Sequence, residues 1–148
     1  MIKDKKIVCL IVAKKNSREL KNKNILKING KPLVYWTFQA ANKSKYIDFK
    51  IISTDSKKIA KIAKKNNISA PFMRPKKLAN YNSSIYDVIK HAKKFFNKID
   101  KFDYLILLQP TTPFRTYKHI DLAIKKFQNT PSKNRRSLIS VKKSPKID

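Results

Sequence analysis

Residues 7–24 read IVCLIVAKKNSRELKNKN, and this stretch decides the fold class. Its first seven residues are apolar without interruption, a pattern typical of a strand buried on both faces of a parallel sheet. The chain then turns basic and polar, and open parallel sheets bind ligands in such loops at the carboxyl ends of their strands. Lysine and arginine favour an anion, with phosphate as the leading candidate. Lysine is abundant along the whole chain, so a solvated loop without a ligand remains the alternative.

Strand-like and helix-like segments alternate along the rest of the chain. Further strands are expected at residues 49–54, 104–108 and 137–141, with a short extended segment at 68–73. Helices are expected where apolar residues recur at helical spacing, at residues 32–43, 56–66, 84–97 and 117–128. In the first of these helices we interpret Trp36 as a core anchor. The alternation predicts an α/β fold, with a mostly parallel sheet between layers of helices.

The charge is strongly positive but evenly spread. The chain has 36 Lys and Arg against 9 Asp and Glu, which gives a formal net charge of +27. The lysines occur in every segment, and no signature of an RNA-recognition, zinc-finger or helix-turn-helix module accompanies them. We therefore expect weak, salt-sensitive binding to polyanions and no specific nucleic-acid partner.

Length and hydropathy limit the classes of protein to which the chain can belong. Its 148 residues are enough for one domain with a hydrophobic core. No apolar run reaches the ~18 residues that a membrane span needs, so no membrane association is expected. Lys14 and Lys15 stand where a signal peptide would need small residues, so we expect a cytoplasmic location.

Several common catalytic motifs are absent from the sequence. Its single glycine excludes both the GxxxxGK[ST] and the GxGxxG phosphate loops. No Cys/His spacing suits a metal, and Cys9 is expected to be a small buried hydrophobe. His91 and His119 fall in helical segments and are interpreted as helix-side residues rather than ligands.

Polar and charged side chains that could bind a ligand instead cluster in three loops, each of which follows a predicted strand. These loops are residues 14–24, 53–55 and 109–115. Because a parallel sheet gathers the carboxyl ends of its strands at one edge, the three loops should form one composite site.

Five sequence blocks resemble, in the same order, the acylneuraminate cytidylyltransferases, also called CMP-sialic acid synthetases. The blocks are IVAKKNSRELKNKN, INGKPLVYWT, IISTDSKKIAKIAK, PFMRPKKLA and LLQPTTPFRTYKHI. The resemblance covers nearly the whole chain. Its most specific part is the combination of LLQPTTPFRT, residues 107–116, with STDS, residues 53–56.

The resemblance implies a fold and an activity. The fold would be a Rossmann-like nucleotidyltransferase three-layer sandwich, with residues 1–148 as a single cytidylyltransferase domain. The activity would be transfer of a cytidylyl group from CTP to the anomeric hydroxyl of a nine-carbon (nonulosonic, sialic-type) acid, with Mg²⁺ as cofactor, yielding pyrophosphate and a CMP-sugar for cell-surface polysaccharide biosynthesis. N-acetylneuraminic, legionaminic and pseudaminic acids share this loop set, so the acid stays open.

The resemblance also implies roles for individual residues. Lys14 stands where the family has an arginine on the triphosphate, and Lys23 matches its phosphate-binding lysine, so both are assigned as catalytic. Gln109 matches a glutamine on the sugar-acid side. The nucleotide-binding positions are Ser17, Arg18, Asn24 and Arg74. Fixed cations and a metal would stabilise the charge that the α-phosphate gains during attack.

Some positions depart from the family pattern. Lys14 lacks the bidentate fork of an arginine, Glu19 replaces a glycine, and Tyr81 and Asn82 replace an Asp-Thr pair. The family also continues well beyond the position of Asp148, with acidic Mg²⁺ ligands and a dimerisation arm. We therefore expect the chain to be truncated at its carboxyl end. The sequence offers no candidate for the metal ligands, and a homodimer is an option for a full-length form.

Two further interpretations stay open beside the enzyme. One is a truncated, catalytically impaired homologue that only binds nucleotide. The other is a basic nucleic-acid-binding protein, which would bind polyanions tightly without a preference for CTP.

Asp55, in the loop after the second strand, is interpreted as a helix cap rather than a metal ligand.

Overall fold

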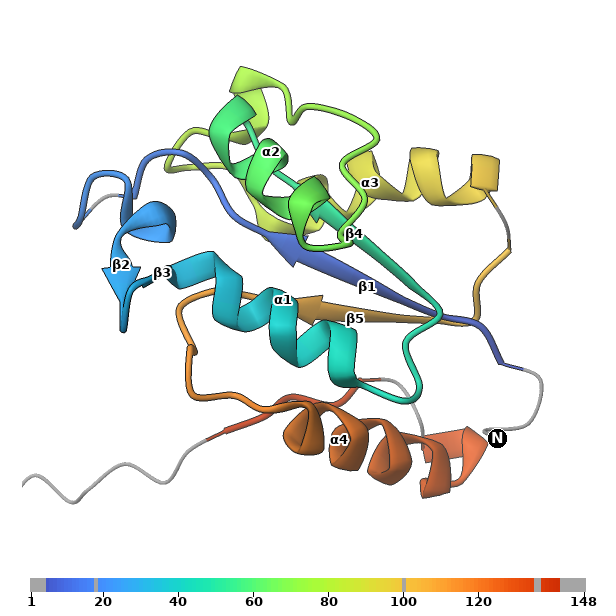
Figure 1. Ribbon diagram of the computed structural model, residues 1–148. Coiled ribbons are helices and arrows are strands. Elements are labelled where there is room, and N and C mark those ends of the chain that lie inside the picture. Colours follow the sequence, from blue (N-terminus) through green and yellow to red (C-terminus); the bar gives the residue numbers. More distant parts are fainter. Residues whose placement is uncertain (1–4, 18, 100, 135–136, 142–148) are drawn as a thin grey trace, which may run out of the picture.

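A three-stranded parallel sheet forms the centre of the computed structural model, which describes residues 5–17, 19–99, 101–134 and 137–141. Strand β1 (Ile7–Val12) lies between β4 (Phe49–Ser53) and β5 (Tyr104–Leu108). Val12 pairs in register with Ser53, and Ile11 pairs with Leu108. All three strands therefore end at the same edge of the sheet, toward which the arrows point in Figure 1.

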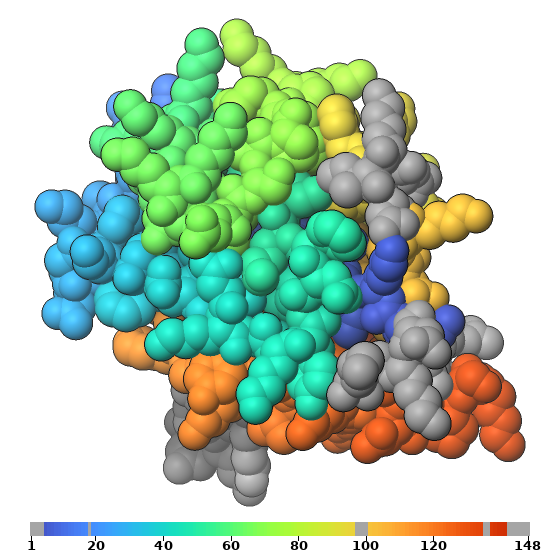
Figure 2. All heavy atoms as spheres, turned by 45° about the vertical axis from the view of Figure 1, so that its right-hand side comes forward, coloured from blue at the N-terminus to red at the C-terminus, as the bar shows by residue number. Residues whose placement is uncertain are grey.

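Helices cover both faces of this sheet. The described helices are α1 (Leu33–Lys43), α2 (Lys57–Lys65), α3 (Ile85–Ile99) and α4 (Tyr117–Asn129). Side chains of α1, α2 and α4 share one apolar cluster with the sheet, and those of α3 belong to the cluster on the opposite face. On the surface, α1 lies between α2 above and α4 below (Figure 2). The predicted α/β architecture of three layers is confirmed.

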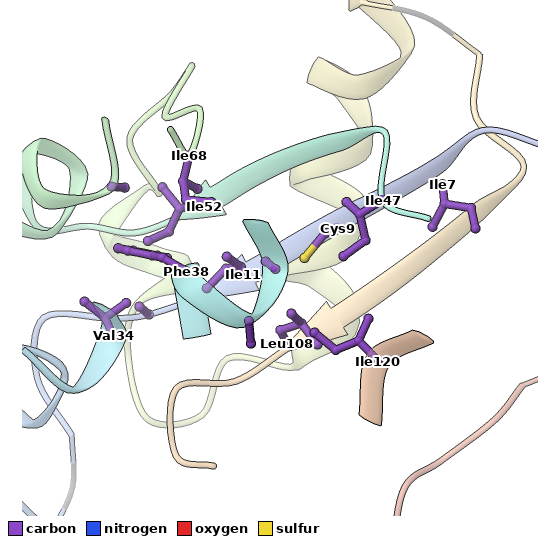
Figure 3. Close-up of a cluster of buried hydrophobic side chains, with 14 of the residues drawn as sticks. Ile7, Cys9, Ile11, Val34, Phe38, Ile47, Ile52, Ile68, Leu108 and Ile120 are labelled. Carbon is purple, nitrogen blue, oxygen red and sulfur yellow. The ribbon is translucent and has the colours of Figure 1, made fainter. Parts of the chain in front are cut away.

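The uninterrupted apolar run of β1 fills both layers of the core. Ile7, Cys9 and Ile11 point toward α1 and α4, among the side chains drawn in Figure 3. Val8 and Leu10 point to the other face, against α3. Because successive residues of a strand face opposite sides, both sets must be apolar when both faces are covered. Cys9 is fully buried, and this burial raises the pKa of its thiol to about 12, as fits a small hydrophobe.

A small hairpin connects the first loop to α1. Its strands are β2 (Lys27–Ile28) and β3 (Lys31–Pro32), joined by Asn29 and Gly30 with φ of 49° and 74°. Two consecutive positive φ angles suit the tight turn of a two-residue hairpin. Short 3-10 turns occupy η1 (Lys23–Ile25), η2 (Lys76–Leu78) and η3 (Ser132–Asn134).

Trp36 departs from its expected role as a core anchor. Its side chain is half-buried, and its indole Nε1–H donates to the backbone carbonyl oxygen of Ile28 at 3.2 Å. The core side of α1 is formed by Val34, Thr37 and Phe38 instead. Trp36 thus connects the hairpin to α1 from a flank of the helix. The helical spacing of the apolar residues does not distinguish this flank from the buried face.

Two other expectations were wrong. Residues 137–141 form no strand, and Ile139 and Val141 are 79% and 87% exposed, since no neighbouring strand pairs with this apolar run in the described structure. Asp55 does not cap α2. The hydroxyl of Ser56 accepts the N–H of Ile59 at 3.3 Å, whereas Asp55 Oδ1 accepts the backbone N–H of Lys15 at 2.7 Å.

The remaining elements agree with expectation to within a few residues. The segment 68–73 is extended, and Ser69 forms a parallel bridge with Ile51. Within the described residues, none of the helices combines the length and the apolar character that a membrane crossing requires.

Candidate active site

The loops after β1 and β4 are joined at the carboxyl edge of the sheet. Ala13 N–H donates to the carbonyl oxygen of Ser53 at 3.1 Å. Two residues further on, Lys15 N–H donates to the Asp55 carboxylate. These contacts follow from the register of β1 and β4, which ends both strands at the same level. The expected meeting of these two loops is therefore confirmed.

Within the first loop, Asn24 holds the backbone of Lys14. Asn24 is 6% exposed, and its Nδ2 donates to the Lys14 carbonyl oxygen at 2.8 Å. The chain reaches Asn24 through Asn22, whose φ of 57° lies in the left-handed region that asparagine tolerates. Lys14 and Asn24, predicted as site residues from the sequence, are thus brought into direct contact.

Arg74 fastens the end of β4. It is 7% exposed, and its Nε donates to Ser53 Oγ at 3.0 Å while Nη2 donates to the Ser53 carbonyl oxygen at 2.6 Å. Its backbone N–H also donates to the Thr54 carbonyl oxygen at 2.8 Å. Burial lowers the pKa of Arg74, and the charge of Asp55 opposes this shift. The hydrogen bonds of its guanidinium to Ser53 thus use Nε and Nη2.

Lys14 carries its charge over an aromatic ring. Its Nζ lies 4.8 Å from the ring centroid of Tyr81, which belongs to the segment between η2 and α3 and is 51% exposed. An ammonium within about 6 Å of a ring centroid is attracted by the negative face of the ring. No sequence pattern indicates this contact, although Lys14 and Tyr81 both depart from the family pattern.

Gln109 is exposed directly after β5, and Arg115 holds its backbone. Arg115 Nη2 donates to the Gln109 carbonyl oxygen at 2.8 Å and lies 3.4 Å from Thr37 Oγ1 on α1. Burial lowers the pKa of Arg115, and its Nε is buried without a hydrogen-bond partner among the described residues. Sequence reasoning placed Arg115 in the third loop but gave it no role. The signal was present, since it is the one cation between Gln109 and Thr116.

The other predicted site residues of the first loop have fewer contacts. Lys23 begins η1 and Ser17 lies earlier in the loop, and both are half-buried. Arg18 lies outside the described residues. The structure therefore relates Lys14, Asn24 and Arg74 to one another through the strand ends, and it leaves the roles of Ser17, Lys23 and Gln109 as predictions.

Both histidines lie on helices, as expected. His119 Nδ1 accepts the backbone N–H of Thr116 at 3.0 Å and completes the cap of α4. His91 lies on α3 with its ring centroid 4.9 Å from that of Phe72. Burial lowers the pKa of His91, and neighbouring cations, first Lys94, lower it further.

The described residues do not form a metal centre of their own. No group of three or more His, Cys, Asp or Glu side chains lies together in this part of the chain. Asp55, the carboxylate that joins the first two loops, already accepts the Lys15 N–H. The described residues therefore supply no complete set of protein ligands for Mg²⁺, an ion that is commonly bound by one or two carboxylates together with phosphates and water.

Comparison with protein families and curated proteins gives a consistent result. A family model described as Cytidylyltransferase matches residues 8–145. An N-acylneuraminate cytidylyltransferase of Escherichia coli is 39% identical over 124 residues, which are 83% of this chain and 28% of that protein. A CMP-N,N'-diacetyllegionaminic acid synthase of Legionella pneumophila is 36% identical over 120 residues, 80% of this chain and 52% of that protein. The chain thus spans about half or less of the length of these relatives.

Solved structures share the fold. A CMP:2-keto-3-deoxy-manno-octonic acid synthetase complexed with CTP superposes with a TM-score of 0.70 at 21% identity, covering 86% of this chain and 49% of that one. A cytidylyltransferase from Leptospira borgpetersenii gives a TM-score of 0.70 at 23% identity, covering 86% of this chain and 51% of that one. The Rossmann-like arrangement expected from the sequence is therefore confirmed.

Proposed function

Because this chain belongs to the cytidylyltransferase family, we propose that it transfers a cytidylyl group from CTP to a nine-carbon, sialic-type sugar acid. The match over residues 8–145 carries this proposal. The names of the relatives support the substrate class, since they include proteins for N-acylneuraminic, diacetyllegionaminic and pseudaminic acids. Which of these acids this chain uses is left to experiment.

The first loop would bind the triphosphate. Lys14 and Lys23 supply positive charge, and Ser17, Arg18 and Asn24 supply hydrogen-bond donors in the same loop. In the transfer, the anomeric hydroxyl oxygen of the acid forms a bond to the α-phosphorus, and the bond from that phosphorus to the bridging oxygen of pyrophosphate breaks. The hydroxyl proton is released to solvent. Fixed cations favour this step because they stabilise charge that develops on the phosphoryl oxygens.

The ends of β4 and β5 would complete the site. Arg74 has two of its donor nitrogens on Ser53, so it would support the end of β4 beneath the nucleotide. Gln109 is exposed at the end of β5, which lies on the other side of β1, and its amide suits the hydroxyl and carboxylate groups of a sugar acid. Arg115 holds the Gln109 backbone in place.

Other parts of the proposal rest on the family resemblance. They are Mg²⁺ as cofactor, a cytoplasmic location, a supply of activated sugar for cell-surface polysaccharides, and a homodimer in a longer form. The described residues supply no complete set of protein ligands for this metal.

Pyrophosphate release tests the proposed transfer. The protein is incubated with CTP, Mg²⁺ and, separately, N-acetylneuraminic, legionaminic or pseudaminic acid. We expect release with one of these acids and none when the acid is left out. A protein that binds CTP but releases no pyrophosphate with any acid would support the interpretation as a nucleotide-binding homologue.

A further inference from the structure

Lys14 and its neighbour Lys15 are held by three parts of the chain. The backbone carbonyl oxygen of Lys14 accepts from Asn24, and the backbone N–H of Lys15 donates to Asp55. The Lys14 ammonium lies over the Tyr81 ring. We propose that Tyr81 is a positioning residue, which holds the Lys14 ammonium in place for an incoming nucleoside triphosphate. This inference rests on the proposed function of the site.

An aromatic ring holds a cation without neutralising it. A carboxylate in the same place would form an ion pair and compete with phosphate for the ammonium, whereas the neutral ring leaves the formal charge intact. Lys14 forms no ion pair with a carboxylate of the described residues. The ring also restricts a flexible four-carbon side chain before binding, which reduces the conformational entropy lost when the ligand arrives.

Tyr81 is carried by a turn that is itself well fixed. Ser83 Oγ donates to the Lys77 carbonyl oxygen at 2.8 Å and lies 2.6 Å from Asn80 Oδ1. Asn82 N–H donates to the same Asn80 oxygen at 3.1 Å. The ring is half exposed, so a truncation there leaves the core intact. These bonds fix the backbone of the turn that carries the ring.

The chain contains other lysine–tyrosine contacts, and their location separates them from this one. Lys31 and Tyr35 are four residues apart, where β3 leads into α1, and Lys90 and Tyr86 lie one turn apart on α3. Lys125 Nζ lies 5.9 Å from the ring centroid of Tyr46. Tyr46 precedes β4 and therefore lies at the amino edge of the sheet. Lys14 and Tyr81 instead join two loops distant in sequence, at the carboxyl edge. The Lys125–Tyr46 pair is a matched control at the opposite edge.

The test is a double-mutant cycle on CTP affinity, measured by calorimetry. Tyr81→Leu removes the ring and should weaken CTP binding about two- to fivefold, the range for a partly exposed cation–π contact. Tyr81→Phe keeps the ring and should bind like the wild type. In a Lys14→Ala background, Tyr81→Leu should have no further effect, because the residue it positions is gone. Tyr46→Leu and Lys125→Ala should leave the affinity unchanged.

A spectroscopic readout tests the contact without a ligand. The Lys14 Cε protons should show an upfield ring-current shift by NMR that Tyr81→Leu abolishes and Tyr81→Phe retains. If Lys14→Ala weakens CTP binding while Tyr81→Leu does not, the positioning role is overturned and the proposed function stands. If Tyr81→Leu lowers CTP affinity equally in the wild-type and Lys14→Ala backgrounds, the ring acts on the nucleotide directly. That result would also overturn the positioning role. A wild-type protein with no preference for CTP would overturn the proposed function itself.

Discussion

Arg74 Nη2 donates a hydrogen bond of 2.6 Å to the backbone carbonyl oxygen of Ser53, the last residue of β4. Both residues are buried, and the same guanidinium also bonds the Ser53 side chain. A charged donor therefore satisfies the last carbonyl oxygen of β4, where the strand ends and the loop of the candidate site begins. Arg74 has a structural role whatever it does for a nucleotide.

Replacing Arg74 should lower stability. Arg74→Ala removes two charge-assisted bonds and leaves a buried carbonyl oxygen without its charged donor, so we expect a loss of about 2–3 kcal/mol in the free energy of unfolding. Urea denaturation measures this loss. Ser53→Ala removes the Nε contact alone and should cost about 1 kcal/mol. An Arg74→Ala protein as stable as the exposed-site control Lys76→Ala would show that the bonds contribute little.

Arg115 should support the third loop. Arg115→Ala leaves the Gln109 carbonyl without its charged donor, and we expect a loss of about 1–3 kcal/mol in the free energy of unfolding. Thr37→Val removes the more distant acceptor, at 3.4 Å, and keeps the side-chain shape, so its effect should be smaller. The same denaturation experiment compares them. A larger effect of Thr37→Val would assign the anchoring to α1 rather than to the loop.

His91 should make stability depend on pH. Its pKa is lowered in the folded protein, chiefly by burial, so near and below the ordinary value of 6.5 the unfolded chain binds more protons than the folded one. The contribution of His91 to the free energy of unfolding is fully present above pH 6.5, and it decreases as the pH falls through this value. His91→Gln should flatten the unfolding free energy between about pH 7 and pH 5 relative to the wild type. Parallel curves for the two proteins would contradict the assignment.

Cys9 should be unreactive until the protein unfolds. Its thiol is fully buried and its pKa is raised to about 12, so almost no thiolate is present at pH 8. A chromogenic disulfide reagent should therefore label Cys9 at a rate limited by opening of the fold, and rapidly in urea. Immediate labelling of the native protein would show that the layer between β1 and α1 is open.

Sequence reasoning captured the features that depend on local pattern. The apolar run Ile7–Ala13 predicted a doubly buried strand, and its two faces fill the two apolar clusters. The alternation of strand-like and helix-like segments predicted the parallel sheet, and the parallel sheet brought the loops after β1 and β4 together.

What the sequence missed depends on contacts between distant segments. The Lys14–Tyr81 and Arg115–Gln109 contacts require the placement of whole loops, which no local spacing encodes. Asp55 was expected to serve its own helix, but the neighbouring loop offered a backbone N–H and Ser56 took the cap. Residues 137–141 have strand-like composition, and no described strand pairs with them.

The central claim is a CTP site formed by the loop after β1, and calorimetric titration tests it most directly. At moderate salt, CTP should bind more tightly than ATP or pyrophosphate. Lys23→Ala should weaken CTP binding about tenfold or more, as expected for a lost charge-assisted bond, and the control Lys125→Ala should not. Equal weak binding of every polyphosphate, or binding of short DNA without CTP, would contradict the account and leave the net charge of +27 as the cause of binding.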